Sequence, residues 1–196
     1  MRVLPLFLLT IACSSSPALE RGPLAGARPQ PVAALGADGM AQVEANWKER
    51  LEQPFVYVEQ RGDYRNLGAA MQRLLAEVQA LGLHDVGAPF ALFFDDPGKT
   101  QVAELRARVC CPVADRPSRL GELQFDVLPR AMVVYARVEG DHPTVARAYP
   151  ALFSFLHELG WQQGGPVREV YLMDASAAGS AGLLTEVQIP WAARGE

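Results

Sequence analysis

Basic residues, histidines, cysteines and long apolar runs are all scarce in this chain of 196 residues. Lys and Arg number 18 against 22 Asp and Glu, which gives a formal net charge of −4. No cluster of Lys and Arg lies along the chain, so we expect no surface suited to neutralise phosphates. DNA and RNA binding are therefore disfavoured.

The histidines and cysteines lack the spacing of a metal site, and we expect neither a metal nor a cofactor. His84, His142 and His157 are scattered over expected turn and helix positions. Cys110 and Cys111 are neighbours on an expected strand, where adjacent side chains point to opposite faces. We therefore predict no disulfide between them, with Cys111 in the core and Cys110 on the other face. Without a histidine at matching local spacing, a nucleophilic or metal-binding thiol is disfavoured.

An apolar run near the N-terminus is too short to cross a bilayer, which takes ~20 apolar residues. Arg2 and the run Val3–Ile11 have the form of an export signal, so we assign residues 1–12 to a signal peptide. Thr10-Ile11-Ala12-Cys13 resembles the bacterial lipobox, which implies cleavage before Cys13 and a lipid on its sulfur. An ordinary signal peptide cleaved further on is the alternative. With Ser14, rather than Asp, directly after the cysteine, the sequence resembles lipoproteins sent on to the outer membrane, so we expect a periplasm-facing protein anchored in the cell envelope.

Two segments separate this signal from the expected domain. Residues 13–38 are rich in Ser, Pro, Ala and Gly, without a period that could bury a face, and predict a flexible tether. Residues 39–53 contain Met40, Val43, Trp47 and Leu51 at helical spacing, and predict a short helical lead-in packed on the domain.

The rest of the chain, residues 54–194, partly repeats itself at an offset of 78 positions, without a gap. Apolar content of 49% and charged content of 20% are ordinary for a globular domain. The coincident pairs include Val56/Val134, Tyr57/Tyr135, Gly62/Gly140, Leu74/Leu152, Gly82/Gly160, Val109/Val187 and Pro112/Pro190. We predict an internal duplication, with module 1 at 54–115 and module 2 at 122–194 and a ligand cleft where the halves meet.

Each module reads as strand, helix, strand, strand. Alternation of apolar and polar residues predicts the strands, and apolar residues at spacings of three and four predict the helices. Pro150 falls inside the second helix, where we expect a kink because proline removes a backbone hydrogen bond.

The second module resembles the GyrI-like small-molecule-binding domain, which is also the effector-binding domain of AraC- and MerR-type regulators. The residues that carry the resemblance are Gly164-Gly165-Pro166, Glu169-Val170-Tyr171 and the segment Thr185–Pro190. The resemblance implies an α+β fold of two βαββ modules with pseudo-twofold symmetry, an antiparallel sheet with helices on one side, and a ligand cleft on the other. It also implies that an acidic residue at the position of Glu186 lies in the pocket and receives cationic or polar ligands.

Alternation along the last strand assigns its faces. Val187 and Ile189 should face the helices, which points Glu186 and Gln188 toward the cleft. Arg108 matches Glu186 at the 78-residue offset, so it should approach from the other module. The alternative is that Glu186 is merely paired with an arginine or exposed on an open sheet face.

Aromatic and acidic residues complete the expected ligand-binding wall. Glu169 and Tyr171 share a face of their strand, and a carboxylate among aromatic rings favours a cation. The further candidates are Phe93, Trp161, Tyr57 and Tyr135, for each of which plain packing is the alternative.

These residues favour an envelope-tethered protein that binds an amphipathic or cationic organic molecule. The first alternative is a small-molecule hydrolase that uses Glu186 as acid or base and Tyr171 to orient the substrate, as some members of this family are hydrolases. The second is a non-catalytic interaction module of the envelope. A gyrase inhibitor conflicts with export, and no DNA-binding segment is expected before the domain.

Overall fold

A computed structural model describes residues 43–140, 142–173 and 183–193. The predicted signal peptide, Cys13 and the tether over 13–38 lie outside the described residues. No helix among the described residues has the length and apolar character needed to cross a membrane.

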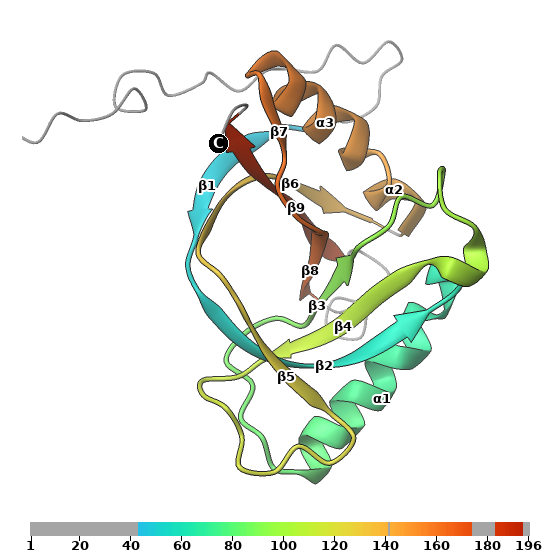
Figure 1. The fold of residues 1–196 in the computed structure, drawn as a ribbon, viewed down its shortest axis with the longest axis vertical. Coiled ribbons are helices and arrows are strands. Elements are labelled where there is room, and N and C mark those ends of the chain that lie inside the picture. Colours follow the sequence, from blue (N-terminus) through green and yellow to red (C-terminus); the bar gives the residue numbers. More distant parts are fainter. Residues whose placement is uncertain (1–42, 141, 174–182, 194–196) are drawn as a thin grey trace, which may run out of the picture.

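The described strands form an antiparallel sheet in the order β1-β6-β9-β8-β3-β4-β2-β5, and the short β7 pairs with β9 (Figure 1). The strands are β1 Asn46–Arg50, β2 Gln53–Arg61, β3 Phe90–Phe93, β4 Arg106–Pro112, β5 Gln124–Leu128, β6 Ala131–Glu139, β7 Trp161–Gln163, β8 Val167–Met173 and β9 Leu184–Ala193. The helices are α1 Leu67–Ala80, α2 His142–Val145 and α3 Ala148–Glu158, with short 3-10 turns η2 Tyr64–Asn66 and η3 Val102–Glu104.

The sheet curls, and the long helices α1 and α3 lie outside the curl (Figure 1). The main core lies between the helices and the outer face of the sheet. Four residues of α1 at the predicted spacing are buried there: Leu67, Ala70, Leu74 and Val78. The α+β fold with an antiparallel sheet and helices on one side is confirmed.

Contacts between β1 and the β5–β6 connection join the two ends of the curl. Arg130 Nε lies 2.8 Å from Glu49 Oε1, and Arg50 donates to the carbonyl oxygen of Pro129 at 2.9 Å. The face of the sheet that points away from the helices, here called the inner face, is therefore partly enclosed. A curl of about eight strands has an interior that side chains or one small ligand can fill.

The helical lead-in predicted over 39–53 is wrong for its described part, because β1 occupies Asn46–Arg50 and pairs with β6. Trp47 packs on the main core as predicted, but Leu51 is 64% exposed. Pairing with a strand that lies more than eighty positions away decides the conformation, and local spacing cannot report such pairing.

The kink predicted at Pro150 is instead a break between α2 and α3. Pro150 is the third residue of α3, inside the first turn, where a missing backbone N–H removes no helical hydrogen bond. The chain therefore restarts its helix just before the proline.

The element bounds repeat at the offset found in the sequence. β1 and β5 begin at Asn46 and Gln124, and β2 and β6 at Gln53 and Ala131, so each pair is 78 positions apart and of equal length. The strand order is symmetric about the contact between β8 and β3, with β1 paired to module 2 and β5 to module 1. The duplication and the module bounds stay predictions, and this symmetry supports them.

Candidate ligand-binding site

The inner face carries the polar residues predicted on β9. Val187 and Ile189 belong to the main core, whereas Glu186 and Gln188 point to the other side of the strand, as the alternation predicted. Both residues are buried: Glu186 is 3% exposed and Gln188 is 4% exposed. The predicted orientation of this strand is confirmed.

Glu186 receives three hydrogen bonds from inner-face side chains. Lys48 Nζ lies 2.6 Å from Oε1 and Arg137 Nε lies 2.9 Å from Oε2. Gln188 Nε2 donates to Oε1 at 2.6 Å. Burial raises the pKa of the Glu186 carboxyl, but the three hydrogen bonds together outweigh it, and its pKa lies below the usual value.

Tyr135 completes the surroundings of the Lys48 ammonium, which lies 4.4 Å from the centre of the Tyr135 ring. A carboxylate and an aromatic face therefore enclose a cation in this structure. Lys48 comes from β1, at one end of the sheet, and its side chain remains 35% exposed.

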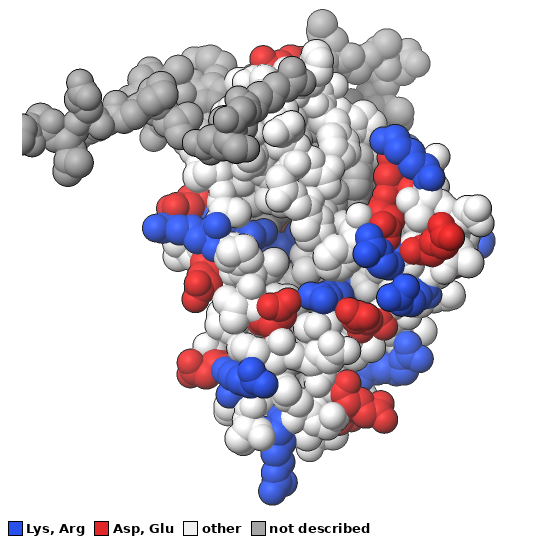
Figure 2. Space-filling view, in the orientation of Figure 1, with Lys and Arg blue, Asp and Glu red and all other residues white. Residues whose placement is uncertain are grey.

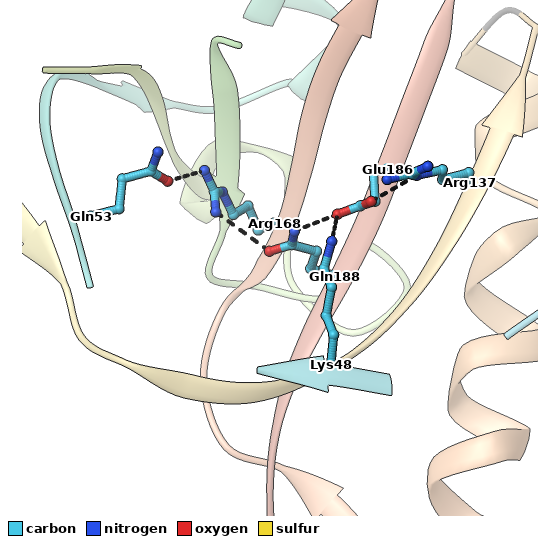
Figure 3. Close-up of polar contacts among 6 residues, drawn as sticks. All are labelled: Lys48, Gln53, Arg137, Arg168, Glu186 and Gln188. Carbon is cyan, nitrogen blue, oxygen red and sulfur yellow. Dashed lines mark hydrogen bonds and ion pairs between the residues drawn. The ribbon is translucent and has the colours of Figure 1, made fainter. Parts of the chain in front are cut away.

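A chain of polar side chains continues from Glu186 across the inner face (Figure 3). Gln188 accepts a hydrogen bond from Arg168 at 3.4 Å, and Arg168 donates from its other terminal nitrogen to Gln53. Arg168 is only 4% exposed, and its guanidinium carbon lies 3.9 Å from the centre of the Phe90 ring.

Arg108 lies on the inner face of module 1, as predicted. It is ion-paired to Asp126 at 2.9 Å and to Glu59 at 3.4 Å, and its guanidinium carbon lies 4.2 Å from the centre of the Tyr57 ring. Tyr57 also donates to Gln124 at 2.9 Å. The structure thus places Glu186, Gln188, Arg108, Tyr57 and Tyr135 on one face, from both modules.

Glu169 and Tyr171 do not belong to this wall, which corrects the prediction. Glu169 is 2% exposed and faces α3, where Tyr149 donates to Oε1 at 2.6 Å and Tyr171 to Oε2 at 3.4 Å. Burial, reinforced by the Glu169 charge, raises the pKa of both phenols. Because Tyr171 and Glu186 lie on opposite faces of the sheet, they cannot act as the predicted hydrolase pair.

Phe93 and Trp161 are also on the helix side and serve packing. Phe93 is buried in the main core, with its ring centre 5.0 Å from that of Tyr64. Trp161 stacks on Trp191 with ring centres 3.6 Å apart and meets Phe155 edge to face. Neither residue lines the inner face.

The two cysteines are free and lie as predicted, Cys111 in the main core and Cys110 in an apolar cluster on the inner face. Burial raises the pKa of both thiols, that of Cys111 to about 11, which disfavours the thiolate. In the part of the chain that the structure describes, no three His, Cys, Asp or Glu side chains gather as metal ligands would.

The sequence-based prediction missed Lys48, Arg137, Arg168 and Gln53. Two features of the sequence could have indicated Arg137 and Lys48. Arg137 is two residues from Tyr135 and so shares its face of β6. The 78-residue offset also aligns Glu44 with Glu122 and Trp47 with Phe125, which extends the repeat to the strand that carries Lys48.

Comparison with known proteins identifies the family. The model of the GyrI-like small molecule binding domain matches residues 44–192. The chain belongs to the GyrI-like family. This match begins before residue 54, the predicted start of the domain, and includes all of β1. No curated protein matches the chain.

Solved structures share the fold of this GyrI-like domain at low identity. The C-terminal domain of EcmrR is 22% identical with a TM-score of 0.69, over 77% of this chain and 98% of that one. In an EcmrR–DNA complex the same match covers only 58% of the EcmrR chain. SAV2435 bound to tetraphenylphosphonium is 13% identical with a TM-score of 0.55, over 76% and 94% of the chains. A hydrolase encoded by lin2189 from Listeria innocua is 11% identical with a TM-score of 0.56, over 76% and 91%.

Proposed function

We propose that this GyrI-like domain captures an amphipathic organic cation on the inner face of its sheet, with Glu186 as the acceptor. The observation that carries the proposal is the place of the Lys48 ammonium, 2.6 Å from Glu186 and 4.4 Å from the centre of the Tyr135 ring. Such surroundings favour any organic cation, and Lys48 is an internal occupant that a ligand can displace. Its side chain is 35% exposed, so solvent already reaches it where it lies.

The inner face also carries apolar residues, which are buried in this structure, so the face must open before the body of such a ligand can contact them. A cluster of buried apolar side chains lies on it beside the polar chain: Phe55, Tyr57, Phe90, Leu92, Cys110, Leu128 and Val170. Carboxylates and aromatic rings close together suit a cation with apolar substituents. The complex of SAV2435 with tetraphenylphosphonium, a cation of this kind, supports the same choice.

Calorimetric titration of the full chain tests the proposal with two ions of similar size and opposite charge, tetraphenylphosphonium and tetraphenylborate. We expect saturable binding of the cation, weakened at least about tenfold in Glu186→Gln. Glu158→Gln, on the exposed side of α3, is the matched control and should bind as the wild type does. Absence of saturable binding of the cation, or equal binding by Glu186→Gln, would overturn the proposal.

We further propose that the domain is exported and anchored in the outer membrane, facing the periplasm, through a lipid on Cys13. The support is the sequence alone, namely the apolar run Val3–Ile11 and the lipobox-like Thr10–Cys13. Metabolic labelling with an alkynyl fatty acid tests it. The wild type should take up label and float with outer membranes, and Cys13→Ser should do neither; an unlabelled wild type contradicts the anchor.

A further inference from the structure

Two arginines on the inner face, the buried Arg168 and the half-buried Arg50, have no carboxylate partner among the described residues. Arg168 is 4% exposed, and its terminal nitrogens reach only the amide oxygens of Gln53 and Gln188. Arg50 donates to the carbonyl oxygen of Pro129. None of the ion pairs among the described residues includes either arginine. A buried charge is costly unless an opposite charge accompanies it, and Arg168 has no carboxylate at ion-pair distance in the described part of the chain.

Each arginine also has a buried N–H group without an acceptor. The Nε atoms of Arg50 and Arg168 are both shielded from solvent and make no hydrogen bond in the described part of the chain. A buried donor without an acceptor costs free energy, and native proteins avoid it. The edge of a guanidinium that carries Nε and one terminal nitrogen is the edge that binds both oxygens of a carboxylate.

The two charges are close enough to repel each other. Burial, followed by the positive charge of Arg50, lowers the pKa of Arg168 to about 10. Both side chains stay protonated at neutral pH, so the repulsion persists. Gln188 separates Arg168 from the Glu186 carboxylate, whose oxygens already accept hydrogen bonds from Lys48, Arg137 and Gln188.

An open cavity of about 330 Å³ lies beside Arg50 and Gln53. Arg50, Gln53 and the carboxylate residue Glu52 form its polar wall, and Pro54, Val86 and Val113 are among its apolar residues. Gln53 connects the two parts, because it lines the cavity and also accepts the hydrogen bond from Arg168 (Figure 3). A volume of this size suits a small organic molecule. Lys and Arg side chains alternate with Asp and Glu side chains across the middle of the face seen in Figure 2.

We propose that Arg168 and Arg50 form an anion-binding subsite for the carboxylate of a small organic acid. The acid enters from the cavity, displaces the side chain of Gln53 and accepts hydrogen bonds from the free Nε–H groups. Phe90, beneath the Arg168 guanidinium, and the apolar cavity wall contact its hydrocarbon part. This subsite does not depend on the cation site at Glu186.

Calorimetric titration of the full chain with three probes of one shape tests the subsite: naphthalene-1-carboxylate, its neutral carboxamide, and 1-naphthylmethylammonium. We expect the carboxylate to bind at least about tenfold tighter than the carboxamide. Arg168→Gln and Arg50→Gln should each remove most of this preference, and Arg168→Lys should restore only part of it because an ammonium lacks the two-pronged edge. Arg73→Gln, exposed on α1, is the matched control and should change nothing.

Equal binding of carboxylate and carboxamide overturns the subsite, as does an unchanged preference in both arginine variants. Circular dichroism melting of each variant accompanies the titrations, and Arg50→Gln keeps the test valid if Arg168→Gln does not fold. Inorganic phosphate serves as a competitor, and its displacement of the carboxylate with higher affinity would overturn the choice of a carboxylate. Tetraphenylphosphonium binding is measured in the same variants. If this binding is lost only in Glu186→Gln and the wild type does not prefer the carboxylate to the carboxamide, the subsite is rejected and the proposed function stands.

Discussion

Glu186 and Arg108 occupy matching places in the two halves of the sheet, 78 positions apart, and carry opposite charges. Glu186 lies opposite Arg137 in the register of β9 with β6, and Arg108 lies opposite Glu59 in the register of β4 with β2. A third residue in each half also matches at this offset: Lys48 on β1 pairs with Glu186, and Asp126 on β5 pairs with Arg108. One half therefore presents a carboxylate held by two cations, and the other a guanidinium held by two carboxylates.

Removing Lys48 should strengthen cation binding, because the ammonium competes for the place between Glu186 and Tyr135. In Lys48→Met we expect the affinity for tetraphenylphosphonium to rise about tenfold, measured by calorimetric titration. Lys99→Met, whose side chain is 84% exposed, is the matched control. A lower affinity in Lys48→Met would show that Lys48 supports the site instead of occupying it.

The pair of Arg108 and Asp126 should contribute little stability, because both side chains are partly exposed, at 23% and 51%. A double-mutant cycle of Arg108→Gln and Asp126→Asn, followed by urea unfolding, should give a coupling free energy of about 0.2–1 kcal/mol. A coupling well above this range would contradict a weak, solvent-screened pair.

Acid should remove the stability that Glu186 contributes. Its folded-state pKa lies below the ordinary 4.5, so the unfolded chain takes up this proton at a higher pH than the folded one. The contribution is complete above the unfolded pKa and disappears as the pH falls through the folded pKa. The free energy of unfolding of the wild type minus that of Glu186→Gln should therefore shrink below pH about 4.5. A difference that stays constant from pH 7 to pH 3 refutes the depressed pKa.

Tyr149→Phe should destabilise the fold without changing ligand binding. The variant leaves the buried Glu169 carboxylate without its 2.6 Å donor, which should cost about 1–3 kcal/mol in urea unfolding. Tyr171→Phe removes the 3.4 Å contact and should cost less. Tetraphenylphosphonium affinity should stay unchanged in both variants, since Glu169 faces α3. Weakened binding in both would place Glu169 in the ligand site after all.

Cys110 and Cys111 should react slowly with iodoacetamide in the folded protein. Both are buried, and burial raises the pKa of both thiols. Peptide mass spectrometry should find both positions unmodified in native buffer and both alkylated in denaturant, since no disulfide joins them. Rapid native labelling of Cys110 would indicate that the inner face opens.

Local patterns in the sequence were enough to predict much of this domain. The apolar stripe from Leu67 to Val78 predicted α1. The alternation of Val187 and Ile189 with Glu186 and Gln188 predicted both faces of β9. These predictions hold because one face of each element is apolar and the other polar, so a single period identifies the buried side.

Only the tertiary structure decided the face of β8, the state of residues 46–50 and the partners of Glu186. Both faces of β8 carry apolar residues, Val167 and Tyr171 on one and Val170 and Leu172 on the other, so alternation separates the faces without saying which meets the helices. β1 is a strand because β6 pairs with it across the chain, and that pairing alone brings Lys48 to Glu186. Long-range pairing chooses among conformations that local sequence leaves equal.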